Sequence, residues 1–128
     1  MLKTNERFKE WDECLKATDS FLKYLEASPS LAGTQYSRYM IAMSLRFPKL
    51  VREVSMKDGL YSKAEQEFSA SRINIERSIR YLLYNTLLAH FEEVLGNRRM
   101  HITIKQFFSI SCRFIYAYPE KLKIQSKE

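Results

Sequence analysis

Glycine and proline are scarce in this sequence, with three residues of each among 128. Sandwiches, barrels and α/β folds need turn residues at short intervals, whereas long stretches of this chain contain neither glycine nor proline. Because few turns are available for a sheet, the chain is predicted to be all-α. Its length suits one domain with a core of its own and leaves no room for a second full domain.

Cysteine and histidine are also scarce, with two residues of each. These residues are Cys14, Cys112, His90 and His101. They show no close ligand spacing, so we expect no metal site, and no cofactor is expected either. The N-terminus is charged from its third residue, which fits neither a secretory signal nor a membrane span. We therefore expect a reduced, cytoplasmic protein that has no membrane segment.

Motifs for catalysis are absent as well. The sequence contains no glycine-rich phosphate loop, no nucleophile–base arrangement and no metal cluster. The acidic pair Glu92-Glu93 is expected to be solvated on a helix. We therefore expect neither an enzyme nor catalytic residues.

Positive charge is what the chain has in excess, with a formal net charge of +6. Residues 1–32 carry five basic and six acidic groups, whereas residues 97–128 carry seven basic and two acidic groups. An uneven basic charge suits a polyanionic partner, most often nucleic acid, although a modest positive charge also aids solubility. The charge alone leaves both interpretations open.

Apolar periodicity predicts an amphipathic helix over residues 4–27. Its seam, spaced three and four residues apart, consists of Phe8, Trp11, Leu15, Thr18, Leu22 and Leu25. Such a seam either packs on the core of its own chain or joins two chains. We expect intramolecular packing for most of the helix. The protein would then be a monomer, or a weak homodimer that forms on DNA.

Further helices are predicted over residues 34–47, from Pro48, from Ser62, from about Ser71 to Leu88 or Leu95, and from Thr103 to about Tyr116. The second helix is expected to turn Tyr36, Tyr39, Met40, Met43 and Phe47 inward. Ser62 and Glu65 have the spacing of a capping box. The predicted organisation is an N-terminal amphipathic helix (1–30), a compact multi-helix domain (31–118) and a solvated basic tail (119–128).

Two of these helices flank the joint Ser69-Ala70-Ser71 and predict a central helix-turn-helix, although the joint lacks the usual glycine. At about 3.6 residues per turn, one face of the second helix carries Ile75, Ile79, Leu82 and Thr86, with Leu83 beside it. The opposite face carries Arg77 and Tyr84, flanked by Asn74, Arg80 and Tyr81. Guanidinium, amide and phenol groups read base edges and hold phosphates in a major groove.

The block GLYSKAEQEFSASRINIERSIRYLL resembles the C-terminal DNA-binding effector domain of the sporulation initiation response regulator, the stage zero sporulation protein A family of endospore-forming bacteria. Leu60-Tyr61, Phe68 and the run from Ile75 to Arg80 carry most of the resemblance. It spans roughly residues 33–116 and is strongest over residues 59–80. The resemblance implies an all-helical transcription-factor domain whose recognition helix enters the major groove.

Single positions follow from the same resemblance. Glu76 and Arg77 match the acidic-basic pair that the family uses at base edges, and Arg80 matches its second recognition-helix arginine. Tyr81 and Asn74 stand where a histidine and an arginine are expected, which affects the preferred DNA sequence but not the binding mode. The connection after Gly96 is shorter than the family's. Residues 1–30 predict one helix where a receiver domain would have a β/α fold, so we expect no regulation through a receiver aspartate.

We therefore expect a sequence-preferring transcriptional regulator that places residues 72–88 in the major groove of duplex DNA. The residues expected to contact DNA are Asn74, Glu76, Arg77, Arg80, Tyr81, Tyr84, Arg98, Arg99 and Lys105. Within this set, Arg98, Arg99 and Lys105 would neutralise phosphates beside the groove. The alternative is a protein-interaction module that binds RNA polymerase or another regulator without reading DNA.

Overall fold

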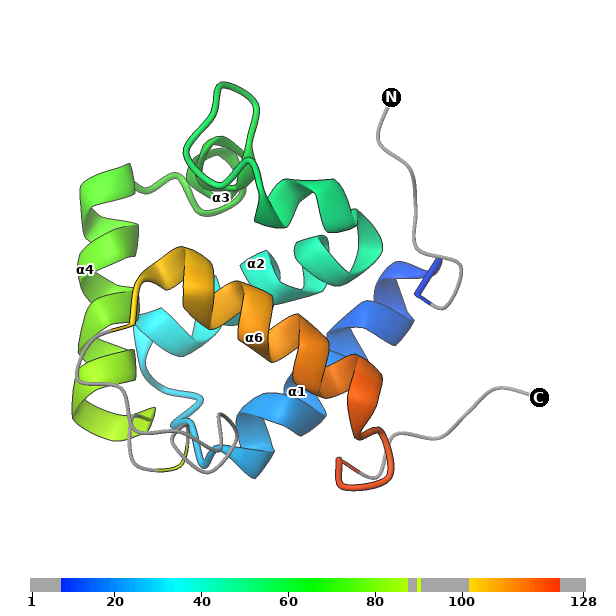
Figure 1. Ribbon diagram of the computed structural model, residues 1–128. Coiled ribbons are helices and arrows are strands. Elements are labelled where there is room, and N and C mark those ends of the chain that lie inside the picture. Colours follow the sequence, from blue (N-terminus) through cyan, green and yellow to red (C-terminus); the bar gives the residue numbers. More distant parts are fainter. Residues whose placement is uncertain (1–7, 88–89, 91–101, 123–128) are drawn as a thin grey trace.

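The computed structural model describes residues 8–87, 90 and 102–122, which form helices and connecting turns without any strand (Figure 1). The all-α fold class is thereby confirmed. In chain order the elements are α1 (Trp11–Tyr24), α2 (Ala32–Arg46), the 3-10 turn η1 (Pro48–Val51), α3 (Leu60–Phe68), α4 (Arg72–Leu82), the π-helical turn η2 (Leu83–Leu87) and α6 (Ile104–Ala117). In this part of the chain, no helix is both long enough and apolar enough to cross a membrane.

Helix α2 lies at the centre of the fold and contacts α1, α3, α4 and α6 (Figure 1). Its close approach to α4 depends on Gly33, because a Cβ atom there would overlap the carbonyl oxygen of Ser78. Met40 is fully buried, as expected, and so are Ile41 and Leu45. α4 is therefore fixed against the central helix by close backbone packing.

The expected inward face of α2 is only partly correct. Tyr36, Tyr39, Met43 and Phe47 are half-buried and pack at the margin of the core. The rings of Tyr36 and Tyr39 meet Phe68 of α3 edge-on, at centroid distances of 4.9 and 5.5 Å. The aromatic residues of α2 therefore hold α3 in place, while aliphatic residues on the neighbouring side of the helix fill the core.

Helix α1 packs within its own chain, on α2 and α6. The Phe21 ring lies 5.8 Å from that of Phe114 in α6, which confirms the expected intramolecular packing. The predicted seam is wrong at Trp11 and Leu15, which are only half-buried. The other members of the predicted seam are buried, namely Phe8, Thr18, Leu22 and Leu25, and Cys14, Ala17 and Phe21 are fully buried beside them. The weak dimer on DNA stays a prediction.

Helix α3 does not start with the predicted capping box. The helix begins at Leu60, which places Ser62 inside its first turn, and its N-cap is Gly59. The amides of Leu60 and Tyr61 donate to the carbonyl oxygens of Glu53 and Val54, at 3.4 and 3.1 Å. Because the preceding loop already satisfies the first helical amides, no side-chain cap is required there.

The joint between α3 and α4 is formed without glycine. Ser69 adopts the left-handed conformation, with φ 50° and ψ 44°, which ends α3. Ser71 then caps α4, since its side chain accepts a hydrogen bond from the amide of Asn74 at 3.2 Å. The predicted start of this helix near Ser71 is confirmed.

The end of α4 differs from the expected straight helix, because residues 83–87 form a π-helical turn. An i→i+5 turn holds more residues than an α-turn, so positions within and after it are rotated relative to the α-helical projection. Thr86, expected to face the core, is exposed, and Leu87 is fully buried instead. The expected inward position of Thr86 is therefore wrong.

Helix α6 begins at Ile104 behind a capping box made by Thr103 and Gln106. The Thr103 side chain accepts from the Gln106 amide at 3.1 Å, and the Gln106 side chain accepts from the Thr103 amide at 2.9 Å. After the helix, Leu122 is buried. The basic tail is therefore only partly solvated, since Glu120 and Lys121 are exposed as expected but Pro119 is half-buried and Leu122 packs in the core.

Candidate nucleic-acid interface

One face of α4 is buried and fixes the orientation of the rest of the helix. Ile75, Ile79 and Leu82 are fully buried, as the sequence predicts. At about 100° per residue, the other positions spread over a wide exposed arc. This arc has two parts, a side pointing away from the protein and a side bordering a pocket.

The outward side of α4 consists of Ile73, Asn74, Arg77 and Tyr81, which are all exposed. Ile73 is 67% exposed and Tyr81 56% exposed, which is unusual for large apolar side chains in this protein. Arg77 has neither a hydrogen-bond partner nor an ion-pair partner among the described residues. A guanidinium, an amide, a phenol and an aliphatic group are therefore displayed together on a rigid helix.

The pocket side of α4 consists of Arg72, Glu76 and Arg80, spaced four residues apart. The Arg72 Nε atom lies 2.7 Å from Glu76 Oε1, and an Arg80 Nη atom lies 3.3 Å from Glu76 Oε2. Glu76 thus pairs with these two arginines and does not accompany Arg77 on the outward side, because adjacent helical positions point about 100° apart.

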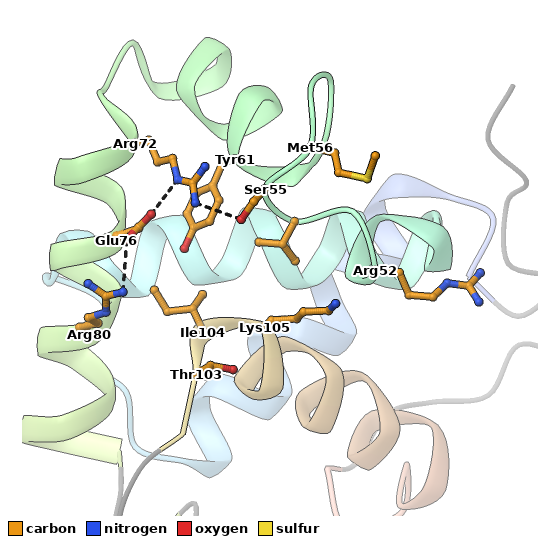
Figure 2. Close-up of a pocket in the computed structure, with 11 residues that line it drawn as sticks. Arg52, Ser55, Met56, Tyr61, Arg72, Glu76, Arg80, Thr103, Ile104 and Lys105 are labelled. Atoms are coloured by element: carbon orange, nitrogen blue, oxygen red, sulfur yellow. Dashed lines mark hydrogen bonds and ion pairs between the residues drawn. The ribbon is translucent and has the colours of Figure 1, made fainter.

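Arg72 also connects α4 to the loop that precedes α3. A second guanidinium nitrogen donates to the Ser55 hydroxyl at 3.0 Å, and the guanidinium carbon lies 4.6 Å from the centre of the Tyr61 ring (Figure 2). Burial raises the pKa of Tyr61 to about 12, and the carboxylate of Glu76 adds to this effect. The pocket side is therefore ordered by several contacts at once.

Tyr84 does not belong to the outward side where the helical projection placed it. Its hydroxyl donates to the carbonyl oxygen of Ile102 at 2.5 Å and accepts from the amide of Ile102 at 3.1 Å. The side chain is half-buried. The expected outward orientation of Tyr84 is wrong, because this residue ties the π-helical turn to the segment that enters α6.

The remaining expected contacts lie at or beyond the start of α6. Lys105 is exposed in the first turn of α6 and borders the same pocket as Arg72 and Arg80. Arg98 and Arg99 lie outside the described residues. The structure thus brings three of the expected residues, Glu76, Arg80 and Lys105, to the pocket, and leaves Asn74, Arg77 and Tyr81 on the outward side.

Ile73, Arg72 and Ser55 were missed by the sequence interpretation. Ile73 could have been found from its spacing, since it precedes Arg77 by four residues and Tyr81 by eight. Arg72 precedes Glu76 by four residues, which is the spacing of a helical ion pair. Nothing local marks Ser55, because its contact with Arg72 depends on how the loop folds back on α4.

The described residues offer no other evident chemistry. Among them, no three His, Cys, Asp or Glu side chains gather as a metal site requires. Cys14 and Cys112 are buried free thiols, and burial raises their pKa values to about 11 and about 12. Such thiols are poor nucleophiles near neutral pH.

Comparison of the chain with models of protein families, with curated proteins and with solved structures returned no match. The resemblance of residues 33–116 to a sporulation-regulator effector domain therefore stays a prediction.

Proposed function

We propose that this protein is a transcriptional regulator that binds duplex DNA with sequence preference and places α4 in the major groove. The resemblance around residues 59–80 suggested this function, and it carries the expectation of an effector domain like that of a sporulation regulator. In this proposal the protein acts in the cytoplasm, without catalysis, as a monomer or as a weak homodimer on DNA.

The outward side of α4 is the observation that supports the proposal most. Arg77 is unpaired among the described residues, and it stands between Ile73 and Tyr81 on a helix whose opposite face is fully buried. An arginine can hold guanine through two hydrogen bonds, an asparagine can hold adenine, and an aliphatic side chain can contact the methyl group of thymine. These groups suit a mixed sequence of bases.

The local geometry also fits this use of the helix. α3 and α4 are joined by only Ser69, Ala70 and Ser71, and both helices rest on α2. Ser71 caps the end of α4 that carries Ile73 and Asn74. Residues at the start of a recognition helix are the ones that contact base edges in helix-turn-helix proteins.

A selection from a random duplex pool tests the proposal, followed by titration of the enriched sequence. We expect a short enriched motif, and we expect Arg77→Ala to weaken binding to it by about 1–3 kcal/mol while relaxing the preference at one base pair. Arg113→Ala is a matched control, because Arg113 is an exposed arginine on α6, away from α4. A wild-type protein that enriches no motif would contradict the proposal.

A protein-interaction module is the second candidate, and the exposure of Ile73 and Tyr81 is what favours it. Aromatic residues and arginine are enriched at protein interfaces, and α4 offers both together with an aliphatic side chain. Such a module would bind RNA polymerase or another regulator, and Arg77→Ala would weaken that complex. It would leave a duplex pool unshifted at moderate salt.

A further inference from the structure

The pocket beside α4 collects positive charge from parts of the chain that lie far apart in sequence. It measures 290 Å³ and is bordered by the loop after η1, the start of α3, the pocket side of α4 and the start of α6. Its charged residues are Arg52, Arg72, Arg80, Lys105 and Glu76. Four lining residues are therefore cationic and one is a carboxylate, although the guanidinium of Arg52 points away from the others (Figure 2).

The single carboxylate, that of Glu76, already forms ion pairs within the protein. Glu76 uses one oxygen for Arg72 and the other for Arg80. Lys105 stands on the opposite wall, and among the described residues its ammonium group has no ion-pair partner (Figure 2). The pocket therefore keeps an excess of positive charge that no described side chain neutralises, and a bound anion would neutralise it.

The polar groups of the pocket favour a tetrahedral oxyanion. Arginine and lysine supply charge-assisted donors from two walls, and the hydroxyls of Ser55 and Thr103 line the same space. Both hydroxyls accept hydrogen bonds within the protein, from Arg72 and from the Gln106 amide, so each can still donate its own proton. Cationic and hydroxyl donors on different walls of the pocket suit the several oxygens of a phosphate.

We propose that this pocket binds a phosphate group, supplied either by the DNA backbone beside the groove or by a free phosphorylated small molecule. The DNA source rests on the proposed function, whereas the free source does not. The pocket lies next to the outward side of α4, since Arg80 borders the pocket and Arg77, three residues earlier, lies on the outward side. A backbone phosphate of DNA bound to the outward side and a free phosphate are therefore both compatible with its position. The chemistry that binds the ligand is the same in both cases.

The first arm of the test uses inorganic phosphate and the purified full chain, with calorimetry or NMR titration as the readout. Lys105→Gln should weaken phosphate binding about tenfold, as expected when one charge-assisted hydrogen bond is lost. Lys23→Gln, which removes an exposed lysine from the far end of α1, should bind like wild type. Chloride at matched ionic strength controls for simple screening.

The second arm measures how duplex binding depends on salt. If the pocket holds a backbone phosphate, Lys105→Gln should lower the log–log salt slope by about 0.9, and Lys23→Gln should not change it. If the ligand is a free phosphorylated molecule, Lys105→Gln should lose phosphate affinity and keep its slope.

The proposal is overturned if Lys105→Gln has the same phosphate affinity and the same salt slope as wild type. It is also overturned if wild type binds no phosphate and Lys105→Gln leaves the salt slope of duplex binding unchanged. A protein that binds phosphate through Lys105 but binds no duplex would refute the proposed function and uphold the pocket. Thermal unfolding of both variants checks that the exposed substitutions leave the fold intact.

Discussion

The two exposed sides of α4 differ in whether their arginines form ion pairs within the protein. On the pocket side, Arg72 and Arg80 share Glu76, and Arg72 also contacts a serine and an aromatic ring. On the outward side, Arg77 points to solvent between Ile73 and Tyr81. Both sides belong to one helix of eleven residues.

This difference separates residues that build the protein from residues that are available to a partner. The contacts of Arg72 join the loop before α3 to α4, so the pocket side takes part in the tertiary structure. Substitutions on the outward side should leave the fold intact, because these exposed side chains make few contacts with the rest of the protein. Surface residues of that kind are where binding specificity is usually carried.

The largest expected effect is a loss of stability on substitution in the buried face of α4, compared with a substitution on its outward side. Ile79→Ala should destabilise the protein by about 2–5 kcal/mol, because a fully buried side chain leaves a cavity behind. Ile73→Ala should change stability by no more than about 0.5 kcal/mol. Urea unfolding measures both. Equal losses would mean that Ile73 packs on the fold and that the outward side is not a separate surface.

A smaller loss is expected at the start of α4, on which both sides depend. Ser71→Ala removes the hydrogen bond to the Asn74 amide and should cost about 1 kcal/mol of stability. Ser62→Ala is the control, because Ser62 lies inside α3 and caps nothing. If Ser62→Ala costs as much as Ser71→Ala in the same urea experiment, the assignment of the two helix starts is wrong.

The comparison between the two sides is sharpest for a pair of arginine substitutions. Arg72→Gln should lower stability by up to about 1 kcal/mol, a small value because the ion pair is partly exposed to solvent. Arg77→Gln should leave stability unchanged. A double-mutant cycle with Glu76→Gln isolates the Arg72–Glu76 coupling. Similar losses for Arg72→Gln and Arg77→Gln would remove the distinction between the two sides.

The smallest effect is a shift in the titration of Tyr61. Its folded-state pKa of about 12 lies above the value of about 10 for an unfolded tyrosine, because burial and the Glu76 carboxylate disfavour the phenolate. The resulting contribution to stability is complete below about pH 10 and is lost as the pH rises toward 12.

Glu76→Gln should lower the pKa of Tyr61, because it removes a nearby negative charge. The ultraviolet absorbance of tyrosinate follows this titration, and Tyr61→Phe identifies the signal. Glu67→Gln is the control, since Glu67 acts on the pKa of Tyr39 instead. An unchanged Tyr61 titration in Glu76→Gln would show that the Glu76 carboxylate does not act on the Tyr61 phenol.

Local signals in the sequence predicted some elements well. The buried stripe of Ile75, Ile79 and Leu82 follows from helical periodicity alone, and the joint at residues 69–71 follows from the change of pattern. The exposure of Asn74, Arg77 and Tyr81 follows from the same projection. These features depend only on neighbours along one helix, so the sequence suffices for them.

Other features required the packed structure. Whether a polar residue on an exposed arc is paired depends on which loop lies opposite, as Ser55 and Tyr61 show for Arg72. The π-helical turn moved Tyr84 and Thr86 away from their expected positions, because it changes the angular spacing that the projection assumes. Sequence periodicity gives no warning of such a turn.

Sparse turn residues, a serine cap and helical periodicity are enough to predict that the chain is all-α, where α4 begins and which of its faces is buried. The packing of α1 on the core of its own chain, and the capping of α3 by carbonyl oxygens of a loop, depend on contacts between distant segments. The same holds for the pocket that Lys105 lines together with Arg72 and Arg80. Such groups are brought together by packing between segments distant in the chain, and no local pattern encodes that packing.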